Sequence, residues 1–168
     1  MKISAFAKFK DIFDDLIGKN RFSKFDFVVL KTMMMLAAVD GEISADEIAG
    51  FRSFAEKCRG YGGESFDKLW DAAVHSAGYL LLQTRFVKQE DLVKAFVKEA
   101  EKDFVGEIAL DEVKDREQAF ASLEQMAAAD GDFSDVERAC ISALETRVKQ
   151  ARNQAIAERY PRAVAFDR

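Results

Sequence analysis

A twelve-residue segment that occurs twice constrains the fold of this chain more than any other feature. Residues 36–47 have the sequence LAAVDGEISADE, and residues 126–137, ninety positions later, have the sequence MAAADGDFSDVE, without a gap. Six positions are identical, since Ala37, Ala38, Asp40, Gly41, Ser44 and Glu47 recur as Ala127, Ala128, Asp130, Gly131, Ser134 and Glu137. Each copy joins an Ala-rich apolar segment to an amphipathic one, which indicates an internal duplication with two pseudo-symmetric halves.

Helical patterns surround both copies. Apolar residues recur at i, i+3 and i+4 spacing, strict alternation never persists, and the single proline is Pro161. These patterns predict an all-α fold of about seven helices, over residues 3–17, 25–39, 44–59, 65–82, 89–104, 111–130 and 134–160. The helices are expected to form one domain over residues 1–160, followed by a frayed tail at 161–168.

The segment 25–39 is apolar nearly all round. A helix of this kind has no face for solvent, so we expect it at the centre of the core. Its methionine cluster, Met33–Met35, is then core and not an adaptable binding surface. Cys58 and Cys140 lie in apolar-periodic segments without metal-ligand spacing. We expect them to be free, buried thiols in a reducing compartment.

The charge distribution excludes some classes of partner. The net charge of −5 argues against a general nucleic-acid-binding protein. Residues 1–31 carry a balance of +3 and residues 147–168 one of +4, which leaves −12 for the body of the chain. The longest apolar runs are far too short to cross a bilayer, and no secretory signal is visible. We therefore expect a cytoplasmic protein.

The repeated turn has a purely structural explanation for part of its sequence. Gly41 can adopt the left-handed conformation that ends a helix. Ser44 and Glu47 form the pattern of a capping box, in which the serine accepts the third amide of the helix and the glutamate reaches back to the serine amide. The same holds for the second copy. This explanation does not require Asp40 or Asp130, which would stand at the negative end of a helix dipole.

A functional explanation accounts for these acids. The spacing Asp-Gly-x₅-Glu matches the second half of an EF-hand calcium loop, but Leu36 and Ala38 occupy the positions where its first acidic ligands would stand. Each turn offers at most about four oxygens, whereas Ca²⁺ takes six to eight, so water or the other turn must complete the site. The predicted ligands of a divalent cation are Asp40, Glu47, Asp130 and Glu137, with Glu42 and Asp132 as second-rank candidates.

The duplicated A-x-D-G-x-x-S-x-x-E turn, in an all-helical chain of this length, resembles the TerB-like domains of tellurite-resistance proteins. The resemblance implies a seven-helix fold with internal pseudo-symmetry and an acidic cluster that binds a divalent metal. It also implies a role in a stress-resistance or tellurite-resistance assembly at the inner face of the membrane, with protein partners. Carried over residue by residue, the acidic site is Asp40 and Glu47 together with Asp130 and Glu137.

Two alternatives stay open beside a non-enzymatic cation-binding scaffold. A metal-dependent hydrolase could use the paired carboxylates, although no nucleophile motif accompanies them and His75 is the only histidine. A peripheral membrane adaptor could use the Phe-rich amphipathic segment 3–17, whose polar face mixes lysines with aspartates. We expect no catalytic residue and no bound cofactor beyond the cation.

Overall fold

The computed structural model describes residues 23–39, 44–58, 87–129, 131 and 133–159. Within these ranges it contains six α-helices and one π-helical stretch, and no strand. In chain order the elements are α2 (Lys24–Ala38), α3 (Ala45–Lys57), α5 (Gln89–Ala100), η1 (Glu101–Val105), α6 (Gly106–Ile108), α7 (Val113–Ala127) and α8 (Asp135–Arg159). The all-α prediction is confirmed. The helices predicted over 3–17 and 65–82, His75 and the tail at 161–168 lie outside the described residues.

Helix α2 lies at the centre of the fold, as its apolar sequence predicts. Every residue from Val28 to Val39 is buried, including the three consecutive methionines. Helices α3, α5, α6, α7 and α8 and the stretch η1 all contact α2. Because α2 is covered by all of them, it can be apolar on every side without exposing apolar surface to water.

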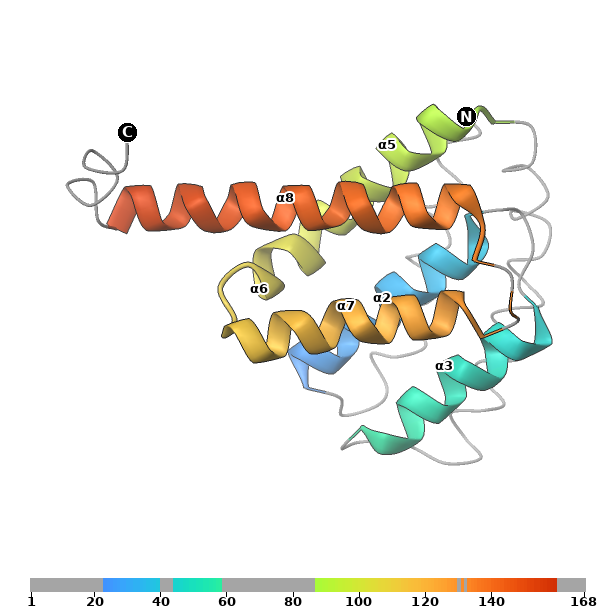
Figure 1. Cartoon of the computed structure of the whole chain (residues 1–168). Coiled ribbons are helices and arrows are strands. Elements are labelled where there is room, and N and C mark those ends of the chain that lie inside the picture. Colours follow the sequence, from blue (N-terminus) through green and yellow to red (C-terminus); the bar gives the residue numbers. More distant parts are fainter. Residues whose placement is uncertain (1–22, 40–43, 59–86, 130, 132, 160–168) are drawn as a thin grey trace.

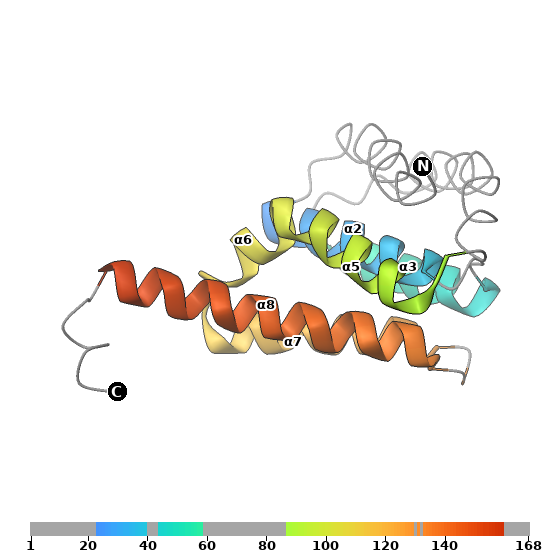
Figure 2. The same cartoon turned by 90° about the horizontal axis from the view of Figure 1, so that it is seen from above.

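The described helices are arranged in layers, and α2 belongs to one of them. In Figure 2, α7 and α8 lie in one layer, and α2, α3 and α5 are stacked on it. Figure 1 shows α7 and α8 running side by side in opposite directions, as expected for two helices joined by a short connection. Helices α2 and α7, which precede the two copies of the turn, pack on each other.

A buried ion pair joins α2 to η1. The ammonium group of Lys31, 3% exposed in the middle of the apolar helix, contacts the carboxylate of Asp103. Helical backbone continues from α5 through η1 into α6, and Figure 2 shows the ribbon change direction there. The other carboxylate oxygen of Asp103 accepts the amide of Phe104, 3.0 Å away. The ring of Phe104 is fully buried and packs edge-on against Phe120. The ion pair therefore stands at the edge of the core.

A second cluster of charged groups forms the corner between α6 and α7. Arg116 and Arg152 both donate to the backbone carbonyl of Asp111, at 2.7 and 3.2 Å. The carboxylate oxygen Oδ2 of Asp111 is itself buried and has no hydrogen-bond partner among the described residues. Burial, reinforced by the carboxylates of Glu107 and Asp115, raises the pKa of Asp111, and Arg116 opposes this only in part. The ionised carboxyl of Asp111 is therefore a destabilising feature of the corner.

Removing the acid from the Lys31–Asp103 pair should reduce stability more than removing both charges. Asp103→Asn keeps an acceptor for the Phe104 amide but leaves the Lys31 ammonium buried beside a neutral group. We therefore expect the free energy of unfolding to fall by about 3 kcal/mol. The double variant Lys31→Met, Asp103→Asn should recover most of that loss. Urea unfolding of Lys31→Met, Asp103→Asn and the double variant measures the coupling free energy between the two residues. If the losses in free energy of unfolding of the two single variants add up to that of the double variant, the two residues are not coupled.

Asp111→Asn should stabilise the protein near neutral pH. A carboxyl whose pKa is raised by folding binds its proton more tightly in the folded state, so its unfavourable contribution grows as the pH rises above its ordinary value of 3.8. The gain should be less than about 1 kcal/mol, because solvent screens a partly exposed group. The difference in free energy of unfolding between variant and wild type should shrink as the pH falls below that value. A difference in free energy of unfolding that does not change with pH would show that the charge of Asp111 is not its cause.

Candidate functional site

The first copy of the turn forms a complete capping box. The Oγ atom of Ser44 accepts the amide of Glu47, and the Oε1 atom of Glu47 accepts the amide of Ser44, both at 3.0 Å. Glu47 is only 3% exposed. The glutamate side chain therefore turns back towards the start of α3, and its carboxylate is held inside the protein.

The second copy repeats this arrangement. Glu137 and Ser134 accept each other's amides at 3.3 Å, and the Ser134 hydroxyl also donates to the Glu137 carboxylate at 2.6 Å. Glu137 is 2% exposed. Gly131 has a φ of +77°, the left-handed conformation that glycine adopts without strain, and its amide donates to the carbonyl of Ala128. The structural explanation of the turn is thus confirmed for the serines, the glutamates and Gly131.

Both copies lie at one end of the molecule. Helices α2 and α7 end there, and α3 and α8 begin there, in the two perpendicular views of Figures 1 and 2. Helix α3 touches the end of α7 directly. A methyl group added to Gly50, one turn after Glu47, would stand 3.7 Å from the Cβ atom of Ala129. Ala129 immediately precedes Asp130 in the sequence.

Of the six predicted cation ligands, the structure describes two. Glu47 and Glu137 are at the same end of the fold, and each uses its Oε1 atom in a capping box. Asp40, Glu42, Asp130 and Asp132 lie outside the described residues. Among the residues that are described, no three His, Cys, Asp or Glu side chains form a group that could hold a metal ion. The cation site thus stays a prediction, which depends on the four acids of the turns.

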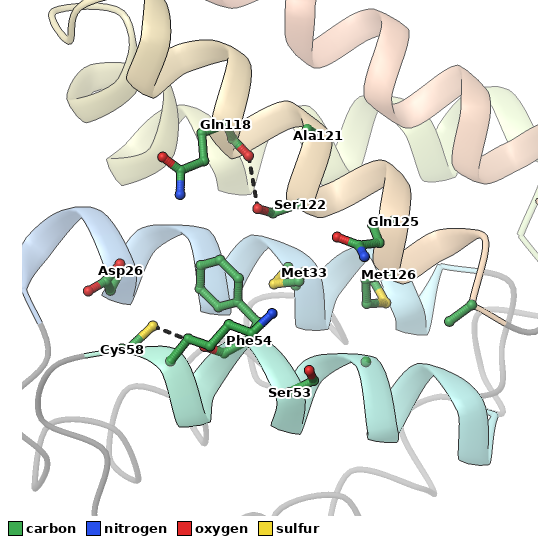
Figure 3. Close-up of a pocket in the computed structure, with 13 residues that line it drawn as sticks. Asp26, Met33, Ser53, Phe54, Cys58, Gln118, Ala121, Ser122, Gln125 and Met126 are labelled. Atoms are coloured by element: carbon green, nitrogen blue, oxygen red, sulfur yellow. Dashed lines mark hydrogen bonds between the residues drawn. The ribbon is translucent and has the colours of Figure 1, made fainter.

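A groove between α3 and α7 begins beside the two turns. From their contact near Gly50 the two helices diverge, and α2 closes the bottom of the space between them (Figures 1 and 3). Its volume is about 560 Å³. Met33 and Met126 lie at its floor with Phe54, and Asp26 and Cys58 lie at its wide end (Figure 3).

Sequence reasoning missed this groove, although α7 carries a signal for it. The residues of α7 that line it are uncharged and recur at intervals of three or four: Gln118, Ala121, Ser122, Gln125 and Met126, with Ala129 just past the end of the helix. Such spacing puts them on one helix face. An uncharged, partly polar stripe is not apolar enough to be recognised as core, so only the packing of α3 and α7 shows that it borders a hollow.

The two cysteines are unsuited to nucleophilic chemistry. Burial, together with the carboxylate and hydrogen bond of Asp26, raises the pKa of the Cys58 thiol to about 12. Burial and the charge of Glu137 raise the pKa of Cys140 to about 12 as well. Both thiols are free, Cys140 in the core and Cys58 half-buried. Because the thiolate is the reactive form, neither cysteine is activated at neutral pH.

Two broader findings complete the description of the site. In the part of the chain that the structure covers, no helix is both long and apolar enough to cross a membrane. Comparisons of the chain with protein-family models, with curated proteins and with solved structures find no match. The TerB-like resemblance of the two turns stays a prediction.

The capping serines should each contribute measurably to stability. Ser44→Ala and Ser134→Ala remove the acceptor for a helix amide, so each should lower the free energy of unfolding by about 1 kcal/mol. Ser53→Ala is the matched control, since Ser53 is an exposed serine within α3, and its effect should stay within about 0.5 kcal/mol. Urea denaturation measures all three. Equal effects at Ser44 and Ser53 would show that the cap contributes nothing.

Proposed function

We propose that this protein is a non-enzymatic binding module of the TerB-like type, which takes up a divalent cation, Ca²⁺, between its two acidic turns and binds a protein partner next to them. One observation carries the proposal. The glutamates that close the two turns, Glu47 and Glu137, are both buried, both folded back onto their capping serines, and both at the same end of the bundle.

The chemistry of the turns suits a hard cation. Asp and Glu oxygens are the ligands that Ca²⁺ prefers, and a carboxylate oxygen that accepts one amide still has a lone pair for a metal. Attraction between a cation and a carboxylate strengthens where water is excluded, as it is around Glu47 and Glu137. Neither turn alone offers six oxygens. The close approach of α3 to the end of α7, where a methyl group added to Gly50 would stand 3.7 Å from the Cβ atom of Ala129, supports a site that the two copies share.

The position of the groove supports a binding role. It starts at the contact of α3 with α7, beside the two turns, so a cation that draws the turns together would act at its narrow end. Met33 and Met126 close its floor from the core, and the exposed amides of Gln118 and Gln125 on its α7 side can hydrogen-bond to a partner. In the TerB-like setting, that partner would be a protein of a stress-resistance assembly.

The surroundings of the two glutamates favour binding over catalysis. A metal-dependent hydrolase needs an open coordination position that faces a cleft. Neither Glu47 nor Glu137 is among the residues that line the groove between α3 and α7. The alternative of a membrane adaptor depends on residues 3–17, which lie outside the described ranges, so no observation favours it.

Calcium should stabilise the protein through the turn aspartates. At about a hundred times its dissociation constant, Ca²⁺ should raise the free energy of unfolding of the metal-stripped protein by about 2.7 kcal/mol. Asp40→Asn, Asp130→Asn should abolish both this gain and the heat of binding in calorimetry.

The control variant is Asp46→Asn, Asp135→Asn. It makes the same change in charge at two exposed acids in the first turns of α3 and α8, so it should bind calcium like the wild type. Absence of any heat at millimolar Ca²⁺ would leave the turns as helix caps alone. An equal loss of calcium binding in both double variants would indicate that Ca²⁺ is attracted nonspecifically to an acidic surface.

A further inference from the structure

The exposed large apolar side chains of the described residues gather at one corner of the molecule, far from the turns. They are Leu110, 72% exposed, Val113, 54% exposed, and Ile156, 39% exposed. Leu110 and Ile156 line a common hollow of about 580 Å³ between the α6–α7 connection and the end of α8. Val113 begins α7, three residues after Leu110. Exposed apolar side chains that gather around one hollow, as Leu110 and Ile156 do, are typical of a contact surface.

The end of α8 extends past the rest of the fold at this corner. The last fully buried residue of α8 is Val148, although the helix continues to Arg159. Figures 1 and 2 both show this part of α8 beyond the α6–α7 connection. Arg152 fastens the helix to the corner through the carbonyls of Ala109 and Asp111, each at 3.2 Å. The last turns of α8 are therefore held in place and yet exposed.

Opposite charges flank the apolar patch on two different elements. Arg147 is neutralised by Glu101, and residues 149–159 of α8 carry three basic side chains and one acidic one, a balance of +2. Residues 111–117, at the start of α7, carry four acidic and two basic side chains, a balance of −2. Arg152 and Arg159 form no ion pair with any described carboxylate. The α8 side of the patch is thus basic, and the α7 side is acidic.

We propose that this corner is the contact surface for a second copy of the chain. A surface with an apolar centre, a basic side and an acidic side is complementary to itself under a two-fold rotation. In the dimer, Leu110, Val113 and Ile156 of the two copies pack together, and the basic end of α8 of each copy faces the acidic start of α7 of the other. An anionic membrane fits the surface less well, because the acidic residues beside Leu110 and Val113 would be repelled.

Sedimentation velocity on the full chain tests this proposal. The wild type should form dimers as its concentration rises through the micromolar range. Leu110→Glu, Ile156→Glu should weaken the dimer at least about tenfold, because each substitution puts a charge into the apolar centre. Both residues are exposed in the single copy, so the thermal unfolding midpoint of the variant at low concentration should stay near that of the wild type.

Charge exchange provides the sharper test. Arg159→Glu and Glu112→Arg should each weaken the dimer, and the two together should restore it in part, because opposite charges then face each other again. Lys57→Glu on α3 makes the same charge change as Arg159→Glu at an exposed residue elsewhere and should have no effect. A monomer at all concentrations would overturn the proposal. So would a dimer insensitive to these variants, or retention of a monomer on anionic vesicles that depends on Leu110 and Ile156.

Discussion

Complete burial of α2 is the constraint on which the rest of the structure depends. From Val28 to Val39 this helix has no side for water, so every other described helix must cover part of it. The hydrophobic effect is non-directional, so burial of apolar area alone does not favour one rotation of α2 about its axis over another. The ion pair of Lys31 with Asp103 does distinguish between rotations, because only one of them brings the lysine to that carboxylate. Apolar burial thus holds α2 in the core, and the buried Lys31–Asp103 pair adds a preference for one rotation of the helix.

The two copies of the repeat keep the same turn in different surroundings. Helix α2 is buried all round, whereas its counterpart α7 buries only one face, with Leu123 and Met126 among its core residues. Helix α3 has 13 residues and α8 has 25. A fold of this size has one centre, so only one of the two helices that precede the turns can occupy it. The turn chemistry survives in both copies because a helix start needs the same cap wherever it lies.

The buried glutamates connect stability with the proposed function. In each turn the residue that would close a cation site is also the residue that caps a helix, so Glu47 and Glu137 are held in place before any cation arrives. A preorganised carboxylate loses less conformational freedom on binding than an exposed, mobile one. The proposed contact surface for a second copy lies at the other end of α8, which leaves the turns and the groove between α3 and α7 accessible in the dimer.

The sequence by itself determined the helical class, the central place of residues 25–39, the start of α3 directly after Ser44 and both capping boxes. These features follow from local periodicity and from hydrogen bonds between residues three apart, so no distant contact is needed to predict them. The predicted end of the fifth helix at residue 104 was too early, since the helical backbone continues through η1 to Ile108. Four of the six predicted cation ligands lie outside the described residues, so that prediction is unchanged.

Only the tertiary structure decided that the two copies meet at one end, that α3 and α7 enclose a groove, and that Lys31 pairs with Asp103. Each of these features depends on how helices far apart in the sequence cross one another. The periodicity of side chains along a single helix does not specify where or at what angle it crosses another helix.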